Sequence, residues 1–243
     1  MIIQETSVSL TYKKIDSIKK IYYTNEHILK EFFNEATVLP IPDDAPVEIP
    51  RIIAKTLHEH AQLSISPTVS TFEVKYDSGF ENNWADCESY LKTRMARVID
   101  FLNLLTNNHY EYIGIVSSLL YDDIEQSGKE KIINTLLNTE NIKKIHDINV
   151  KFTFVESDNI FVNIMLQNAR MFKQGIKLDE AGTLNENNQL SEPIGIILDI
   201  NDRYGFNNNA SYQSNCKVLD NLFACMNNIV NNKLTLLIEK GSY

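Results

Sequence analysis

Two acidic residues and a lysine are spaced as in a metal-dependent nuclease. Asp43 follows a proline, and Glu73 and Lys75 come later in the order Glu-x-Lys. In the restriction-type nuclease core, two carboxylates hold Mg²⁺ and the lysine polarises the attacking water. Alternate residues of a strand share a face, so Glu73 and Lys75 would point the same way. An Mg²⁺-dependent nuclease is therefore one alternative, opposed by the proline-rich surroundings of Asp43.

Two histidines have a spacing that could bind a transition metal. His58 and His60 flank a glutamate, which would place both imidazoles on one strand face. A closed zinc site needs four ligands, and the sequence offers no third ligand nearby. We therefore expect solvent-facing or turn histidines, and neither a metal nor another cofactor.

Two aromatic residues are the candidates for ligand contact. Trp84 is the only tryptophan and stands at the start of a predicted helix, where it is expected to fix the helix entry onto the sheet. Tyr212 occupies a similar place before the last predicted helix. The chain has no phosphate-binding P-loop, dinucleotide fingerprint, nucleophile elbow or HExxH sequence. The main interpretation therefore assigns no catalytic residue.

The composition excludes several classes of protein. The 243 residues are 43% apolar, and 23 Lys and Arg against 32 Asp and Glu give a net charge of −9. This composition is that of a folded chain, and its charge disfavours nucleic acid, whose binding depends on Lys and Arg. Three cysteines without a CxxC pair, no signal peptide and no long apolar stretch predict a cytoplasmic protein that does not span a membrane.

The hydrophobic periodicity predicts an α+β fold, an antiparallel sheet with amphipathic helices packed on one face. Strands are expected at 6–12, 51–56, 61–65, 68–76, 112–121, 149–155, 160–167, 194–200 and 233–239. Helices are expected at about 25–36, 84–105 and 128–138, and from residue 211 or 214 onward. Prolines cluster at 40–50 in an irregular connector, and residues 173–192 are predicted to form a mobile loop.

Two segments of the chain are alike. Residues 79–83 read Gly-Phe-Glu-Asn-Asn and residues 205–209 read Gly-Phe-Asn-Asn-Asn, each between a predicted strand and a long helix. We interpret residues 1–243 as one domain of two related halves, about 1–125 and 126–243. The alternative is that strand–turn–helix units are common and that turns favour Gly and Asn.

Several short sequences resemble a sporadically distributed bacterial family of about 250-residue proteins without an assigned biochemical function. They are Pro46-Val47-Glu48-Ile49-Pro50-Arg51, Gln62-Leu63-Ser64-Ile65-Ser66-Pro67, Tyr76 with Trp84, and Ile197-Leu198-Asp199-Ile200 before a leucine-rich helix. The resemblance implies an α+β structure, no enzyme class, and an accessory role in phage defence or beside a toxin.

The leading hypothesis is a non-enzymatic accessory protein that binds another protein or a small ligand, with a homo-oligomer left open. The prolines of the connector and residues 173–192 are the expected contact segments. Besides the nuclease, the other alternative is a tandem ferredoxin-like RNA-binding module, because residues 1–121 can be read as β-α-β-β-α-β. The acidic charge opposes this RNA-binding alternative.

Overall fold

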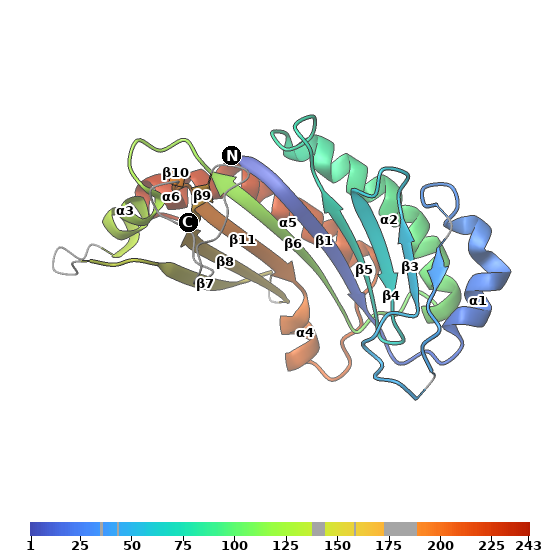
Figure 1. Cartoon of the computed structure of the whole chain (residues 1–243). Helices are drawn as coiled ribbons and strands as arrows, with labels where there is room; N and C mark the ends of the chain where they lie inside the picture. The colour runs from blue at the N-terminus through green and yellow to red at the C-terminus, as the bar shows by residue number, and fades with distance from the viewer. Residues whose placement is uncertain (35, 43, 138–143, 158, 173–188) are drawn as a thin grey trace.

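The computed structural model describes residues 1–243 except 35, 43, 138–143, 158 and 173–188. Nine strands form one antiparallel sheet in the order β2-β3-β4-β5-β1-β6-β11-β8-β7 (Figure 1). These strands are β1 (Ile2–Thr11), β2 (Thr37–Val38), β3 (Ile52–Lys55), β4 (Ala61–Ile65), β5 (Val69–Lys75), β6 (Tyr112–Tyr121), β7 (Asn149–Glu156), β8 (Ile160–Asn168) and β11 (Ile194–Asn201). A separate two-stranded ribbon pairs β9 (Met171–Phe172) with β10 (Gln189–Ser191).

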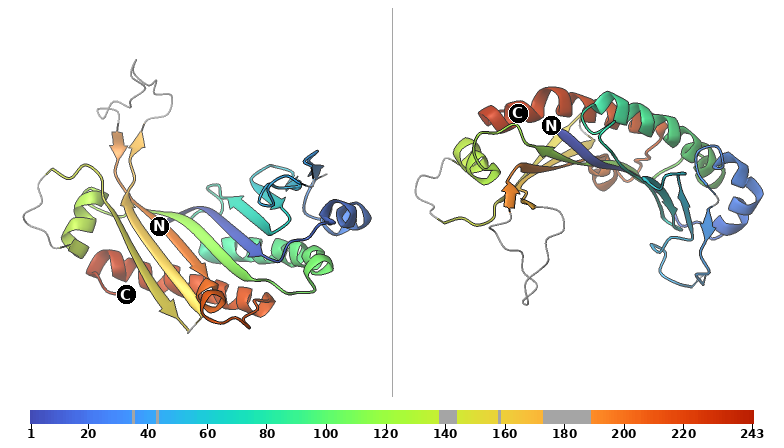
Figure 2. Two further views of the ribbon diagram at one scale, coloured as in Figure 1. Left: turned by 90° about the horizontal axis from the view of Figure 1, so that it is seen from below. Right: turned by 45° about the horizontal axis from the view of Figure 1, so that its top comes forward.

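The longer helices lie together on one side of this sheet. The helices are α1 (Ile18–Asn25), α2 (Trp84–Thr106), α3 (Gly128–Ile132), α4 (Arg203–Asn208), α5 (Cys216–Asn228) and α6 (Leu234–Lys240). The sheet is arched, with α2 and α5 along its convex side (Figure 2). The predicted α+β class and antiparallel sheet are therefore confirmed. In the described part of the chain, no helix is long and apolar enough to cross a membrane.

The predicted helix at 84–105 is confirmed as α2, and its ends explain why. The side chain of Asn83 accepts a hydrogen bond from the backbone N–H of Ala85, which caps the first turn. Asn107 ends the helix in the left-handed conformation, at φ 51°. Between these ends, apolar residues at helical spacing, among them Leu91 and Val98, are fully buried against the sheet.

The inner strands of the sheet bury alternate residues beneath the helices along most of their length. In β1, Val8 and Leu10 are buried, whereas Ser7 and Ser9 between them point away from the helices. We call the side of the sheet to which Ser7 and Ser9 belong the open face. The short helix α4 lies against one end of this face, where Phe206 packs on Tyr112 of β6. The sequence had predicted helices on one face only. The helix α4 departs from that prediction, because it lies on the open face.

Two predicted elements are wrong. The helix expected at 25–36 lies earlier, as α1, where Ile18 and Tyr22 are buried one turn apart. The strand expected at 233–239 is the helix α6, because Leu234, Leu237 and Ile238 are buried at helical spacing. Of the predicted mobile loop at 173–192, residues 173–188 lie outside the described residues, and β10 occupies most of the remainder.

The order of elements is the same on both sides of the sheet centre. β1, α1, β3, β4, β5 and α2 come first, followed by β6, α3, β7, β8, β11 and α5. The strands of the two sets are arranged in mirrored order about the central pair β1 and β6. This comparison leaves out β2, β9, β10 and α4, and in it the second set of elements begins with β6 at Tyr112.

Candidate functional site

A cavity of about 390 Å³ lies at the rim of the sheet, where the end of β5 meets the start of α2, and we call it the rim cavity. It is lined by residues of the β3–β4 turn, the end of β5, the following loop and α2: His58, His60, Val74, Lys75, Tyr76, Asp77, Phe80 and Tyr90. His58, His60 and Lys75, which two separate sequence hypotheses had singled out, therefore meet at one place. Its size is within the range of ligand-binding pockets.

Local backbone geometry positions the two histidines. Residues 57–60 form the turn between β3 and β4, in which Glu59 has a positive φ of 56°. The backbone carbonyl of His60 accepts a hydrogen bond from the N–H of Lys75, which fixes the turn beside the end of β5. Both histidines are therefore turn residues, as expected, and do not stand on a strand face as the metal alternative requires. Their rings stack with centroids 6.4 Å apart.

The loop after β5 supplies the opposite wall. The carboxylate of Asp77 accepts a hydrogen bond from the N–H of Gly79, and its backbone carbonyl accepts another from the N–H of Phe80. This turn leaves the ring of Phe80 38% exposed and packed edge-on against Tyr90, 5.8 Å between centroids. The cavity thus has a partly exposed aromatic wall.

A stack of side chains holds His60 in its neutral form. Its Nε2 atom lies 2.7 Å from the hydroxyl of Tyr90, and the guanidinium of Arg94 covers the other side of this tyrosine, 3.4 Å from the ring centroid. Burial lowers the pKa of His60, and the positive charge of Arg94 lowers it further. Near pH 7 the imidazole is therefore an uncharged hydrogen-bonding group.

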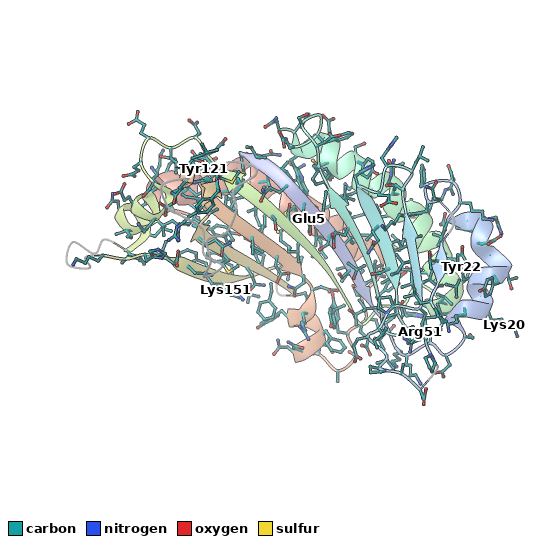
Figure 3. The ribbon with its side chains drawn as sticks, viewed as in Figure 1. Glu5, Lys20, Tyr22, Arg51, Tyr121 and Lys151 are labelled. Carbon is teal, nitrogen blue, oxygen red and sulfur yellow. The ribbon has the colours of Figure 1, made fainter. Side chains whose placement is uncertain are left out.

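An acidic pair adjoins the rim cavity on the open face. The ammonium of Lys75 lies 3.9 Å from a carboxylate oxygen of Glu5 and 3.8 Å from one of Glu73. Burial raises the pKa of Glu5, and the neighbouring carboxylate of Glu73 raises it further. Both distances are longer than a direct hydrogen bond. The single ammonium of Lys75 therefore lies near both carboxylates without a hydrogen bond to either. Figure 3 labels Glu5 near the middle of the sheet.

The structure leaves both catalytic and metal hypotheses without a complete site. Asp43 lies outside the described residues, so the nuclease pair of Asp43 and Glu73 stays a prediction. Glu73 and Lys75 do share the open face, as the alternative requires. Among the described residues, no group of three His, Cys, Asp or Glu side chains is placed to hold a metal ion, and this includes the surroundings of His58 and His60.

The two candidate aromatic residues lie away from the rim cavity lining. Trp84 is 3% exposed at the start of α2 and is part of the core, as expected of a residue that fixes the helix to the sheet. Tyr212 lines another cavity, of about 420 Å³, but its hydroxyl donates a hydrogen bond of 2.8 Å to the buried carboxylate of Asp202. This bond and the contact of its ring with Gly205 give Tyr212 a structural role.

Sequence reasoning missed half of the site. Glu5, Asp77, Phe80, Tyr90 and Arg94 lie in segments predicted as strand ends, turns or an amphipathic helix. Of these, only Phe80 belongs to a sequence singled out above, Gly-Phe-Glu-Asn-Asn at 79–83, and there as a turn residue. The one available signal was the pair Tyr90 and Arg94, four residues apart on the predicted helix and therefore on one face. The remaining contacts depend on strand register, which places Glu5 directly opposite Lys75.

Among the described residues of the site, no side chain has the surroundings of an activated nucleophile. The polar groups of the site are carboxylates, one ammonium and a neutral imidazole, and the buried thiol nearest to it, Cys87, has a pKa raised by burial to about 12. Such a set recognises a charged or aromatic group by contact and charge. No protein-family model matches the chain, and no curated protein matches it significantly, so the family resemblance stays a prediction.

Proposed function

We propose that this protein is a binding module for a basic polypeptide segment. The segment lies across the open face, places an Arg or Lys side chain between Glu5 and Glu73, and inserts an apolar side chain into the rim cavity. The observation that carries the proposal is the shared Lys75, which lines the cavity and is also the only cation within 4 Å of the acidic pair among the described residues.

The charge balance at this end of the sheet favours a cationic partner group. Glu5, Glu73 and Asp77 supply three carboxylates against two full positive charges, those of Lys75 and Arg94, and only Lys75 contacts the acidic pair. Burial raises the pKa of Glu5, Glu73 raises it further and Lys75 lowers it, so a second cation beside the pair would favour the charged form of Glu5. A bound guanidinium would relieve the repulsion between Glu5 and Glu73. A polyanion such as nucleic acid would increase it.

The rim cavity supplies an anchor point. Phe80 and Tyr90 form aromatic walls around a space large enough for one side chain of a partner. Protein interfaces commonly depend on a few apolar or aromatic residues that fill such pockets. An anchor beside a charge contact also fixes the direction in which the partner segment runs.

The middle of the open face suits a polypeptide that passes close to the sheet. Its side chains are short and mostly uncharged, as in Ser7, Ser9, Thr71, Gly114 and Ser118. The hydroxyls of Ser9 and Thr71 lie 3.0 Å apart and can each offer a further hydrogen bond to a bound segment. Interface centres are depleted in charged residues, which agrees with this composition.

Site-specific photocrosslinking tests the proposal. A benzophenone amino acid placed at Ser9 on the open face should capture one discrete partner in the native host, and the same group at Thr93 on the exposed side of α2 should not. The captured protein is then identified by mass spectrometry, produced separately and titrated against the purified chain. Capture of the same protein from both positions would contradict binding at the open face.

Two substitutions separate charge recognition from general damage. Glu73→Gln should weaken the affinity for that partner about tenfold, and high salt should remove most of the difference. Phe80→Ala should weaken it by a similar factor at every salt concentration, because it removes apolar contact. The control Asp220→Asn removes an exposed carboxylate on α5 and should leave the affinity unchanged. An unaltered affinity in both Glu73→Gln and Phe80→Ala would refute the proposal.

The two sets of elements that share one order also support an origin by duplication. Under this proposal β1 corresponds to β6, α2 to α5, and the loop that carries Phe80 to the segment that carries Phe206. The correspondence pairs the halves 1–106 and 112–240. The sequence similarity of residues 79–83 and 205–209 is consistent with it.

A further inference from the structure

The strand β7 ends the sheet with an unpaired edge. All eight residues of β7 pair in continuous register with β8, and among the described residues no strand pairs with its other side (Figure 1). Such an edge presents a row of N–H and C=O groups that can pair with another strand. Natural edge strands are protected from further pairing by prolines, β-bulges, a short length or charged side chains, especially lysine. Of these features, β7 has a single lysine, Lys151.

The apolar side chains of β7 are incompletely covered. Phe152 and Phe154 face the helices and pack against the core, and the ring of Tyr243 stacks on Phe154 with centroids 3.9 Å apart, yet both phenylalanines remain half-buried. On the open face, Val155 is 49% exposed. A strand added next to β7 would cover these three side chains, which is the main source of stability in strand pairing.

The sequence of β7 is nearly symmetric about Thr153. Residues 150–156 read Val-Lys-Phe-Thr-Phe-Val-Glu, in which Phe152 and Phe154 flank Thr153 symmetrically. A twofold axis through Thr153 brings Phe152 opposite the partner's Phe154, Lys151 opposite the partner's Val155 and Val150 opposite the partner's Glu156. Directly opposite residues of antiparallel strands lie on the same face, and this register keeps that condition at every position. No like charges face each other in it.

We infer that the partner of β7 is a second copy of this chain, joined by antiparallel β7–β7 pairing centred on Thr153. The two nine-stranded sheets become one continuous sheet, with the helices of both copies on the same side. This interface lies at the far end of the sheet from the rim cavity. Lys151 marks it in Figure 3, away from Arg51 at the other end of the sheet. The inference does not depend on the proposed binding function.

Sedimentation and crosslinking of the full chain test the inference. The wild type should sediment at about 56 kDa, twice the 27.9 kDa of one chain. Thr153→Cys should form an intermolecular disulfide on mild oxidation, because the axis passes through this residue. Lys151→Cys and Val155→Cys should each crosslink poorly alone, whereas a mixture of the two should form the heterodisulfide. The wild type, which keeps its three native cysteines, gives the background.

A charge variant separates pairing from folding. Thr153 is exposed, so Thr153→Lys should leave one chain folded but place two ammonium groups opposite each other across the axis. The dimer should weaken at least about tenfold at low salt and recover at high salt. Thr93→Lys, at an exposed position of α2, is the matched control and should leave the dimer intact. A wild type that sediments as a monomer would overturn the inference, and so would a dimer that resists Thr153→Lys and forms no Thr153→Cys crosslink.

Discussion

The carboxylate of Asp202 provides the most direct test of the structural role assigned to Tyr212. Asp202 is fully buried at the end of β11, where one oxygen accepts the N–H of Ile113 at 2.6 Å and the other accepts the hydroxyl of Tyr212 at 2.8 Å. Asp202→Ala removes both acceptors and leaves the N–H of Ile113 without a partner inside the protein. We expect this variant to lose about 4–6 kcal/mol of unfolding free energy.

That magnitude follows from the two bonds. A hydrogen bond to a charged group contributes about 1.5–3 kcal/mol, and a buried donor left without an acceptor costs a further 1–3 kcal/mol. The hydroxyl of Tyr212 is only partly buried and can turn to water, so the lower half of the summed range applies. Asp202→Asn keeps one acceptor, and its amide can donate to the hydroxyl of Tyr212. It should cost only about 1–2 kcal/mol.

A double-mutant cycle in urea unfolding measures the pair. Tyr212→Phe alone should cost about 1.5–3 kcal/mol, but almost nothing when Asp202→Ala is already present, because the hydroxyl then has no acceptor to lose. The resulting coupling energy should therefore be at least about 1.5 kcal/mol. If Asp202→Ala costs under about 1 kcal/mol, or if the two substitutions are additive, Tyr212 does not act through Asp202 and its role as a ligand contact returns.

Three further outcomes follow from the structure. Gly128→Ala should lower the free energy of unfolding in urea by about 2–3 kcal/mol, because its methyl group would lie 2.6 Å from a main-chain carbonyl oxygen between β10 and β11. In the control Gly79→Ala, the methyl group meets only a side-chain oxygen at 3.2 Å, and the loss should be under about 1 kcal/mol. The pKa of His60, followed by NMR, should lie below its usual value of about 6.5 and should rise in Arg94→Met. A pKa that this substitution leaves unchanged would contradict the effect assigned to Arg94. Burial raises the pKa of Tyr110 to about 12, so this hydroxyl loses its proton in the unfolded chain before it does so in the folded protein. The free energy of unfolding should therefore fall above pH 10, by up to about 1.4 kcal/mol per pH unit from this residue. Tyr110→Phe should reduce that slope between pH 10 and 12.

Elements with strong local signals could be predicted from the sequence. The hairpin of β7 and β8 follows from two alternating runs of apolar residues around a four-residue turn, and α2 follows from its caps and apolar stripe. The helix α6 could not be distinguished from a strand by its local sequence pattern. Leu234 and Leu236 alternate as in a strand, and only the packing of Leu237 and Ile238 against the core selects the helix.

The rim cavity depends on contacts that no local pattern encodes. Its parts come from segments that the register of β4 with β5 and the crossing of α2 over the sheet bring together. His58 and His60 could be selected by spacing, but the neutral state of His60 comes from burial and from Arg94 in α2. Residues of the site could therefore be predicted where their type and spacing mark them, as for His58 and His60. They could not be predicted where strand register and helix packing decide which side chains meet.

The two edges of the sheet differ in a way that limits assembly to two copies. At the edge opposite β7, β2 has only two residues and leads into the connector that carries Pro40, Pro42, Pro46 and Pro50. Arg51, 3% exposed, holds this connector by donating hydrogen bonds to the carbonyls of Ile49 at 2.6 Å and Ala45 at 3.1 Å. Proline has no N–H to donate and β2 is too short to template a new strand, so this edge is protected. A β7–β7 dimer uses both unprotected edges and leaves only the two protected ones at its ends. Because its axis is twofold, the pairing closes at the dimer, and the open edge strand does not lead to a fibre.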